Sequence, residues 1–289
     1  MLNLALSDTP DGGYRLGTVV HIIGDTHAGK SLLALHLMAE ASINKKLKDY
    51  DLIYEEPESA MFFPVKKMFG EEAERRIKFI PTMAERRKGP RTVQKWHDDL
   101  LAHAVPFVWV TDSFDALTSE EDLSTITADG KKKKLGKGGF RVEKPIVAKQ
   151  LFPKMVGRIE ASQSIFMWIS QTIKNIGVTF GPSETFAGGS AITFFRAYEI
   201  WLAVVERIYI KVRGKDREVG AWVRARIKKN KFTAKVKEVT FPVYPYPYGY
   251  GIDDVGAMVG WMVEEGYWEE ENKDKKKGKK GKYSFTWKR

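Results

Sequence analysis

The chain has 289 residues, and 43% of them are hydrophobic, a composition that allows a sizeable globular core. It contains no cysteine and only five scattered histidines, which argues against a disulfide framework and a zinc site. Lysine and arginine number 48 against 37 aspartates and glutamates, and the net charge of +11 favours polyanionic partners. No apolar run approaches the roughly 20 residues of a membrane span and no signal peptide is evident, so we expect a cytoplasmic protein without a membrane partner.

The first elements in chain order are an arm, a strand, a glycine loop and a helix. Residues 1–17 form the arm, whose apolar start is compatible with a strand that docks on a neighbouring subunit. Residues 18–23 are a β-branched run typical of a strand, and residues 32–43 carry apolar side chains at helical spacing. The loop between them reads Gly24-Asp25-Thr26-His27-Ala28-Gly29-Lys30-Ser31.

This loop matches the phosphate-binding pattern Gly-x-x-x-x-Gly-Lys-Ser, in the strand-to-helix context that the pattern requires. Its glycines allow backbone amides to converge on a phosphate beside the positive end of the helix dipole. We expect Lys30 to reach the β- and γ-phosphates of ATP and the Ser31 hydroxyl to be a ligand of Mg²⁺. The stretch 24–31 is therefore predicted to bind ATP and Mg²⁺.

Further α/β units follow the glycine loop. Strands are predicted at residues 51–55, 77–80, 107–111 and 165–170, and helices at 93–104 and 146–161. The connections are long enough for parallel crossovers, so these elements predict a doubly wound, mostly parallel sheet in a P-loop ATPase core.

Beyond residue 198 the pattern becomes rich in β-structure. Strands are predicted at residues 199–205, 209–213, 219–229 and 236–243, with a turn at Gly214-Lys215. They predict an antiparallel extension of the sheet. A short helix at 252–264 and an aromatic, basic hairpin follow, so we divide the chain into an arm at 1–17, a core at 18–251 and a C-terminal piece at 252–289.

Carboxylates at two strand ends are candidates for ATP hydrolysis. Asp112 stands at the end of a predicted strand, after the four apolar residues Phe107 to Val110 and Thr111. A P-loop ATPase has an acidic residue at this position, which holds the hydration shell of Mg²⁺. A carboxylate near the γ-phosphate is also needed to orient the attacking water. Glu55, Glu56 and Glu58 stand at the end of the second strand, and their spacing does not choose among them.

Two lysine-rich segments are candidates for contact with nucleic acid. One is a glycine-rich loop whose cations are Lys131, Lys132, Lys133, Lys134, Lys137 and Arg141. The other, at residues 273–282, lies between aromatic stretches and is predicted to be the turn of a hairpin. A solvated run of charge is the alternative for both segments.

Three segments resemble the RecA family of bacterial recombinases. Residues 169–191 resemble the stretch from its nucleotide-sensing glutamine through its second DNA-binding loop. Residues 112–117 resemble its second Walker motif, and residues 226–231 resemble its basic strand near the subunit interface. The resemblance extends over most of residues 18–289, in the family's order, and implies a RecA-like ATPase core.

The resemblance implies roles for particular residues. Gln171 would sense the γ-phosphate, Glu58 would be the catalytic glutamate, and Lys229 and Lys231 would reach the ATP of a neighbouring subunit. Contacts with single-stranded DNA would come from Thr172, Lys174, Asn175, Gly177, Phe180, Gly188 and Gly189. Phe180 and Phe186 either pack against the sheet or stack on bases.

The function that the resemblance implies is an ATP-dependent recombinase, with DNA-dependent ATPase activity. It would assemble on single-stranded DNA, as a filament rather than a ring, and promote pairing with a homologous duplex. Its compact form is similar to phage-encoded RecA-like proteins, and a single-strand-binding protein is a further candidate partner. A ring-shaped helicase, with Arg224 or Arg226 as arginine finger, and an annealing or mediator protein are the alternatives.

Overall fold

The structure is a computed structural model that describes most of the chain. The described residues are 1–9, 12–58, 63–87, 89–120, 143–174, 184–186, 193–245, 247–249, 251–264 and 266. The helices are α1 (Leu2–Ser7), α2 (Lys30–Ile43), α3 (Val65–Phe69), α4 (Glu71–Arg76), α5 (Met83–Arg86), α6 (Val93–Ala102), α8 (Glu143–Ala161) and α9 (Asp254–Glu264), with 3₁₀ turns η1 (Lys45–Leu47) and η2 (Phe114–Ala116). The strands are β1 (Thr18–Gly24), β2 (Asp51–Glu55), β3 (Ile77–Ile80), β4 (Phe107–Thr111), β5 (Ile165–Lys174), β6 (Glu184–Phe186), β7 (Tyr198–Val212), β8 (Lys215–Asn230), β9 (Lys237–Tyr244) and β10 (Gly251–Ile252).

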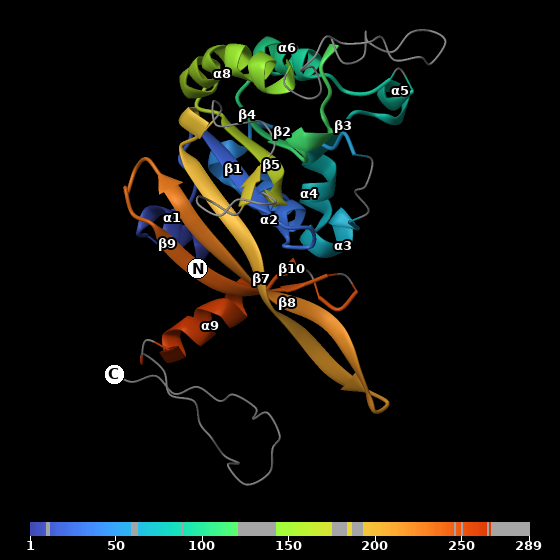
Figure 1. Cartoon of the computed structure of the whole chain (residues 1–289), viewed down its shortest axis with the longest axis vertical. Helices are drawn as coiled ribbons and strands as arrows, with labels where there is room; N and C mark the ends of the chain where they lie inside the picture. The colour runs from blue at the N-terminus through green and yellow to red at the C-terminus, as the bar shows by residue number, and fades with distance from the viewer. Residues whose placement is uncertain are drawn as a thin grey trace.

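The strands form one sheet in the order β10-β9-β8-β7-β1-β5-β4-β2-β3, with β6 paired to β5 beside this path. From β7 to β3 each strand is parallel to its neighbour. The pairs β7–β8, β8–β9 and β9–β10 are antiparallel. The predicted mostly parallel sheet with an antiparallel extension is therefore confirmed (Figure 1).

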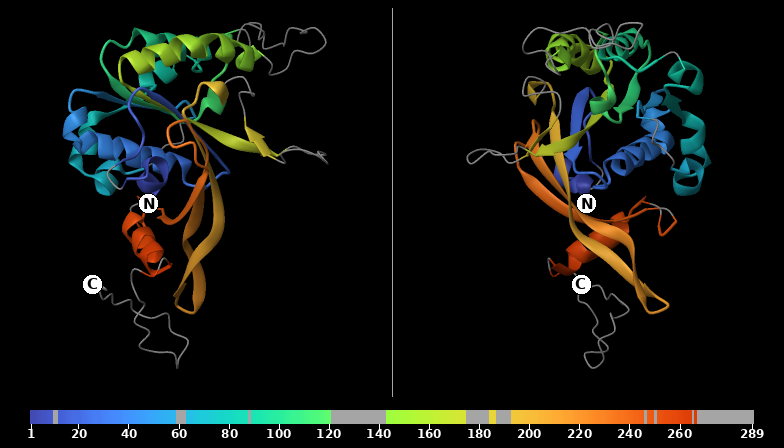
Figure 2. Two further views of the ribbon diagram at one scale, coloured as in Figure 1. Left: turned by 90° about the vertical axis from the view of Figure 1, so that its left-hand side faces the viewer. Right: turned by 45° about the vertical axis from the view of Figure 1, so that its right-hand side comes forward.

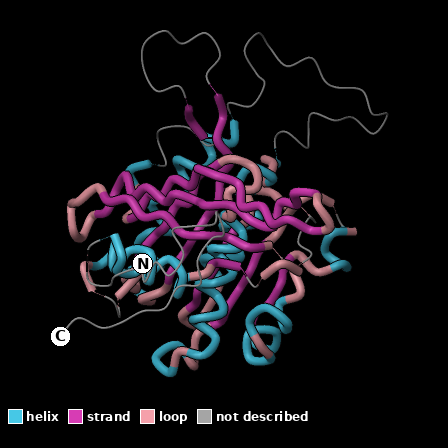
Figure 3. Tube along the Cα trace, turned by 90° about the horizontal axis from the view of Figure 1, so that it is seen from below, coloured by secondary structure: helices cyan, strands magenta, loops and turns pink. Residues whose placement is uncertain are grey.

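Helices cover both faces of the parallel strands, with α6 and α8 on one face and α2, α3 and α4 on the other (Figure 1). Figure 3 shows the long strands of the sheet from below. On one face Val20 and Ile22 of β1 pack with Met38 of α2. On the other face Val19 belongs to a cluster with Trp96 of α6 and Phe152 of α8. Successive strand residues point to opposite faces, so a strand buried on both needs the nearly continuous apolar run that β1 has.

The antiparallel part differs from the prediction in detail. The two strands expected at 199–205 and 209–213 are one strand, β7, because β-bulges between Val204 and Glu206 and between Ile208 and Tyr209 absorb the break in the apolar pattern. The turn consists of Arg213 and Gly214, both with positive φ, and Lys215 already belongs to β8. The resulting hairpin projects from the body of the molecule, away from α6 and α8 (Figure 2).

The N-terminal arm begins with a helix, not with the docking strand that was expected. In α1 the side chains of Ala5 and Leu6 are buried, and the Asn230 side chain donates a hydrogen bond of 2.7 Å to the Leu6 carbonyl. The apolar side chains of the arm thus find partners in the same chain, on β8 and β9. This burial leaves no free strand for a neighbour at residues 2–7.

The predicted C-terminal helix is present as α9, which begins at Asp254 rather than at residue 252. The predicted basic hairpin around residues 273–282 lies outside the described residues. So does the predicted lysine-glycine loop at residues 124–144, except for its last two residues, which belong to α8. Among the described helices, none is both long and apolar enough to cross a membrane.

Candidate nucleotide site

The phosphate loop connects β1 to α2 at the edge where the parallel strands end. Gly24 lies against β7 so closely that a Cβ atom there would stand 2.5 Å from the Leu202 carbonyl oxygen. Gly29 has a φ of 78° and is the N-cap of α2, whose free amides point out of the helix. Both glycines of the pattern are therefore required by the backbone, and the helix start is suited to an anion.

Lys30 lies buried inside this loop. Its ammonium group donates hydrogen bonds of 2.8 Å to the Gly24 carbonyl and 2.7 Å to the Asp25 carbonyl. Burial lowers the pKa of Lys30, while the carboxylates of Asp112 and Asp25 act in the opposite direction. The cation is thus held where a phosphate in the loop would meet it.

Ser31, Tyr54 and Asp112 form a small polar network next to Lys30. The Tyr54 hydroxyl donates a hydrogen bond of 2.7 Å to Asp112, and Asp112 is also hydrogen-bonded to the Ser31 side chain. Burial raises the pKa of Asp112, an effect that these two hydrogen bonds oppose. A hydroxyl and a carboxylate side by side are hard oxygen donors, so the pair fits Mg²⁺ bound together with phosphates.

The three glutamates that follow β2 have different surroundings. Glu55 is fully buried and forms an ion pair of 2.6 Å with Arg91, and Glu56 forms one of 2.9 Å with Arg86. Glu58 is exposed, accepts a hydrogen bond from the Ser113 hydroxyl, and acts electrostatically on Lys30. The structure therefore places Glu58, and not the two ion-paired glutamates, toward the phosphate loop.

Gln171 lies beside the phosphate loop, because β5 pairs with β1 in a register that sets it opposite Gly24. Its backbone N–H donates a hydrogen bond of 2.6 Å to Asp115. The strand does not end there, as the sequence suggested, but continues to Lys174 and pairs with β6. Part of the expected DNA loop is thus a β-hairpin, which projects from the sheet (Figure 2).

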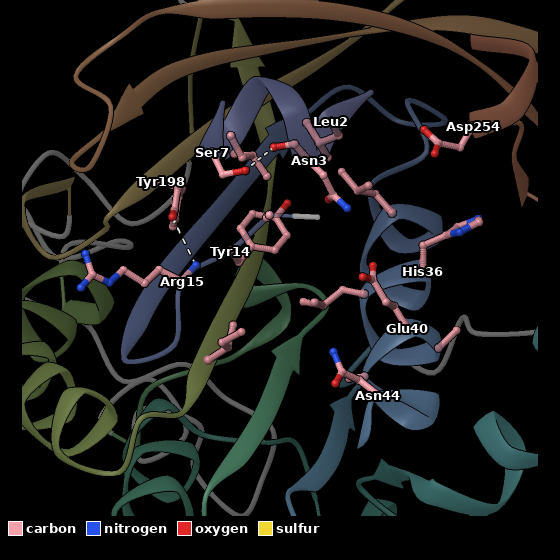
Figure 4. Close-up of a pocket in the computed structure, with 18 of the residues that line it drawn as sticks. Leu2, Asn3, Ser7, Tyr14, Arg15, His36, Glu40, Asn44, Tyr198 and Asp254 are labelled. Carbon is pink, nitrogen blue, oxygen red and sulfur yellow. Dashed lines mark hydrogen bonds between the residues drawn. The ribbon is translucent and has the colours of Figure 1, made fainter. Parts of the chain in front are cut away.

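A cavity of about 850 Å³ lies away from this site, between the N-terminal arm and α2. Figure 4 shows Tyr14, His36 and Glu40 around it. None of residues 24–31 lines this cavity, so it is separate from the phosphate loop.

The protein-family comparison matches the RecA N-terminal domain over residues 2–253. The chain belongs to the RecA N-terminal domain family. It is 28% identical over 255 residues to the RecA proteins of Brucella canis and Brucella abortus, and 27% identical to that of Brucella suis strain ATCC 23445. The alignments include 88% of this chain, which spans about 63% of the length of these curated relatives.

The lysines expected to act across a subunit boundary of the RecA family do not approach the phosphate loop of their own chain. Lys229 of β8 donates a hydrogen bond of 2.8 Å to the Thr193 carbonyl. Burial lowers the pKa of Lys229, and the nearby positive charge of Lys231 lowers it further. The role of the two lysines with a neighbour's ATP stays a prediction.

Most of the predicted DNA contacts lie where the structure gives no description. Thr172 and Lys174 belong to β5, and Phe186 packs against His21 and under Arg196 rather than standing free. The remaining residues lie outside the described ranges: Lys131, Lys132, Lys133, Lys134, Lys137, Arg141, Asn175, Gly177, Phe180, Gly188 and Gly189. Their contact with DNA stays a prediction.

Two residues of the site were missed by sequence reasoning. Tyr54 supports Asp112, and Asp115 fixes the backbone of Gln171. The available signal for Tyr54 was a hydroxyl within an apolar strand, because a buried hydroxyl needs a hydrogen-bond partner. Asp115 gave none, because its partner is 56 residues away in the sequence.

Proposed function

We propose that this protein is an ATP-dependent recombinase that assembles on single-stranded DNA and promotes pairing with a homologous duplex. ATP with Mg²⁺ would bind at residues 24–31, with Asp112 on the metal side and Glu58 orienting the attacking water. Hydrolysis to ADP and phosphate would return the DNA-binding hairpin to its resting position. RecA-family membership and the complete set of phosphate-loop groups support this proposal.

The observation that carries it is the register between β1 and β5. Gly24 of the phosphate loop is opposite Gln171, and Gln171 is the residue at which the projecting part of β5 begins. A phosphate in the loop and the base of the hairpin are thus neighbours across one strand spacing, about 4.8 Å. DNA binding that is controlled by ATP requires the nucleotide and the DNA-binding segment to be close together. A P-loop kinase has no such requirement.

The experiment that tests the proposal is electron microscopy of the protein with single-stranded DNA and a non-hydrolysable ATP analogue. Continuous helical filaments are expected. Closed rings would favour a RecA-like helicase or an annealing protein, and a strand-unwinding assay would separate those two. Absence of any assembly on DNA would reject the proposal.

Replacing the loop lysine tests the dependence on nucleotide. Lys30→Ala removes the cation that reaches the β- and γ-phosphates. We expect it to abolish both ATP hydrolysis and the ATP-dependent increase in DNA affinity, measured by fluorescence anisotropy of a labelled oligonucleotide. Wild-type DNA binding by this variant, with ATP present, would contradict the proposed switch.

A further inference from the structure

Among the described residues, a side-chain hydrogen bond joins the phosphate loop to the β5–β6 hairpin. The Thr172 hydroxyl donates a hydrogen bond to a carboxylate oxygen of Asp25, the second residue of the loop. The carbonyl of the same Asp25 accepts a hydrogen bond of 2.7 Å from the Lys30 ammonium. Asp25 thus contacts both the hairpin and the cation that is expected to receive phosphate.

The other strand of the hairpin is anchored to the core at the same level. Phe186 of β6 is the cross-strand partner of Thr172. Its ring lies edge-on to His21 with centroids 4.7 Å apart, and the Arg196 guanidinium stands 5.0 Å from its centre. The base of the hairpin is therefore held on one side by Asp25 and on the other by a buried aromatic and cationic cluster.

We propose that the Asp25–Thr172 hydrogen bond is a latch between the phosphate loop and the hairpin, and that phosphate in the loop opens it. This inference rests on the proposed function, because it assumes that the loop binds a nucleoside triphosphate. It makes Asp25 and Thr172 positioning residues for the hairpin.

The reason for the opening is electrostatic. A triphosphate brings several negative charges beside the Asp25 carboxylate and competes for the Lys30 ammonium that its carbonyl holds. Like charges repel, so the position of Asp25 that receives the Thr172 hydroxyl becomes less favourable. Gln171 remains fixed by Asp115 and Phe186 by its cluster, so the hairpin gains freedom at Thr172 and turns about Phe186.

The latch can be detected by measuring nucleotide affinity alone. If bound phosphate disfavours the Asp25–Thr172 hydrogen bond, then this hydrogen bond disfavours phosphate binding by the same free energy. A variant without the hydrogen bond should therefore bind nucleotide more tightly. Thr172→Val removes the hydroxyl and keeps the shape of a β-branched strand residue. A hydrogen bond to a charged acceptor corresponds to about a tenfold change in affinity.

The test compares Thr172→Val with the wild-type chain in titrations with a fluorescent, non-hydrolysable ATP analogue and Mg²⁺. Several-fold to about tenfold tighter binding is expected. Hydrogen exchange at the amides of residues 171–174 and 184–186 should respond to nucleotide in the wild type and already be fast in the variant. Thr185→Val, in the same hairpin, is the matched control and should behave as wild type.

If Thr172→Val only disordered the hairpin, amide hydrogen exchange would become faster but nucleotide binding would not become tighter. Unchanged or weaker binding by Thr172→Val would overturn the inference. In an Asp25→Ala background, Thr172→Val should add little, because the acceptor of the Thr172 hydroxyl is already absent. A wild-type chain that binds nucleotide but no DNA would reject the proposed function and leave the latch intact, whereas a chain that binds no nucleotide would reject both.

Discussion

At the scale of single residues, the environment of each carboxylate decides its role. Glu55, Glu56 and Glu58 follow one strand within four positions, and sequence spacing did not separate them. The structure separates them because Arg91 and Arg86 neutralise the first two. Family resemblance had pointed to Glu58, and a physical reason now supports that choice: Glu58 is the exposed carboxylate that acts on both Lys30 and Asp112.

Glu58→Gln should reduce the rate of ATP hydrolysis by about 10²–10⁴-fold, because a neutral amide does not accept the proton of the attacking water. ATP affinity should be retained, since Lys30 and Ser31 are untouched. The measurements are phosphate release and nucleotide titration. Glu56→Gln is the matched control, and loss of hydrolysis in that variant with Glu58 intact would transfer the catalytic role to Glu56.

Some residue-level features were beyond the reach of the sequence. The contacts Tyr54–Asp112, Gln171–Asp115 and Thr172–Asp25 each join segments more than 50 positions apart. Their existence depends on which strands are neighbours and in what register. A sequence motif indicates the chemistry of a single segment, whereas each of these contacts depends on how two distant segments are placed relative to each other.

At the scale of elements, most predicted strands and helices agree with the structure because the periodicities were strong. The runs at 51–55, 77–80 and 107–111 form β2, β3 and β4 with the same bounds. The wrong predictions have local causes. Two bulges interrupt the apolar pattern of β7, so that one strand was predicted as two. The apolar stretch at residues 2–7 is so short that its pattern fits a helix or a strand, and its packing on β8 and β9 as α1 decides between them.

The end of β2 is tied to α6 and β4 by a buried charge. Arg91 bridges Glu55 at 2.6 Å and Asp99 at 2.5 Å, and Glu55 also accepts a hydrogen bond of 2.9 Å from Trp109. Burial raises the pKa of Glu55, and Arg91 opposes that rise. This cluster holds the backbone from which Glu58 extends.

Arg91→Ala should lower the free energy of unfolding by about 3–5 kcal/mol at pH 7, because it leaves a charged carboxylate buried without its partner. Without Arg91 the folded-state pKa of Glu55 lies further above the unfolded value. The deficit should therefore shrink as the pH falls from 7 to below the ordinary glutamate pKa of about 4.3, because only there is the carboxyl neutral in both the folded and the unfolded state.

Denaturant unfolding at a series of pH values measures this effect. Arg75→Ala is the control, because Arg75 pairs with Glu72 at the exposed surface and should leave stability nearly unchanged at every pH. A deficit in Arg91→Ala that did not diminish at low pH would show that lost packing, and not the unpaired charge of Glu55, is responsible.

At the scale of the whole molecule, the described chain holds one part of the proposed catalytic site at the phosphate loop and another on β8. Lys229 pairs with Glu199 of β7, and Glu199 pairs with His21 in the middle of β1 rather than with Gly24 at its end. In the sheet order β8 lies on one side of β1, and β2, which precedes Glu58, lies on the other. Lysines at this place fit a site completed by a second copy. Sequence reasoning reached this idea only through resemblance.

Mixing two inactive variants tests the shared site. Glu58→Gln lacks the water-orienting carboxylate, and the double variant Lys229→Ala/Lys231→Ala lacks the cations offered to a neighbour. Each alone should hydrolyse little ATP, whereas an equal mixture on DNA should regain roughly a quarter of wild-type activity, because about one heterologous interface in four then has both intact parts. No recovery in the mixture would place the lysines outside a shared site.

The pairing of Gly24 with Gln171 also limits how this chain tolerates changes in length. One residue inserted within β1 or β5 would move every later side chain of that strand to the opposite face. The phosphate-loop pattern and Gln171 would both still be present in the sequence, but they would no longer lie next to each other in the sheet. The outer part of the β7–β8 hairpin is exposed on both faces, so matched insertions in its two strands would leave the site unchanged. Variation in length is therefore expected in the hairpin and not in the two central strands.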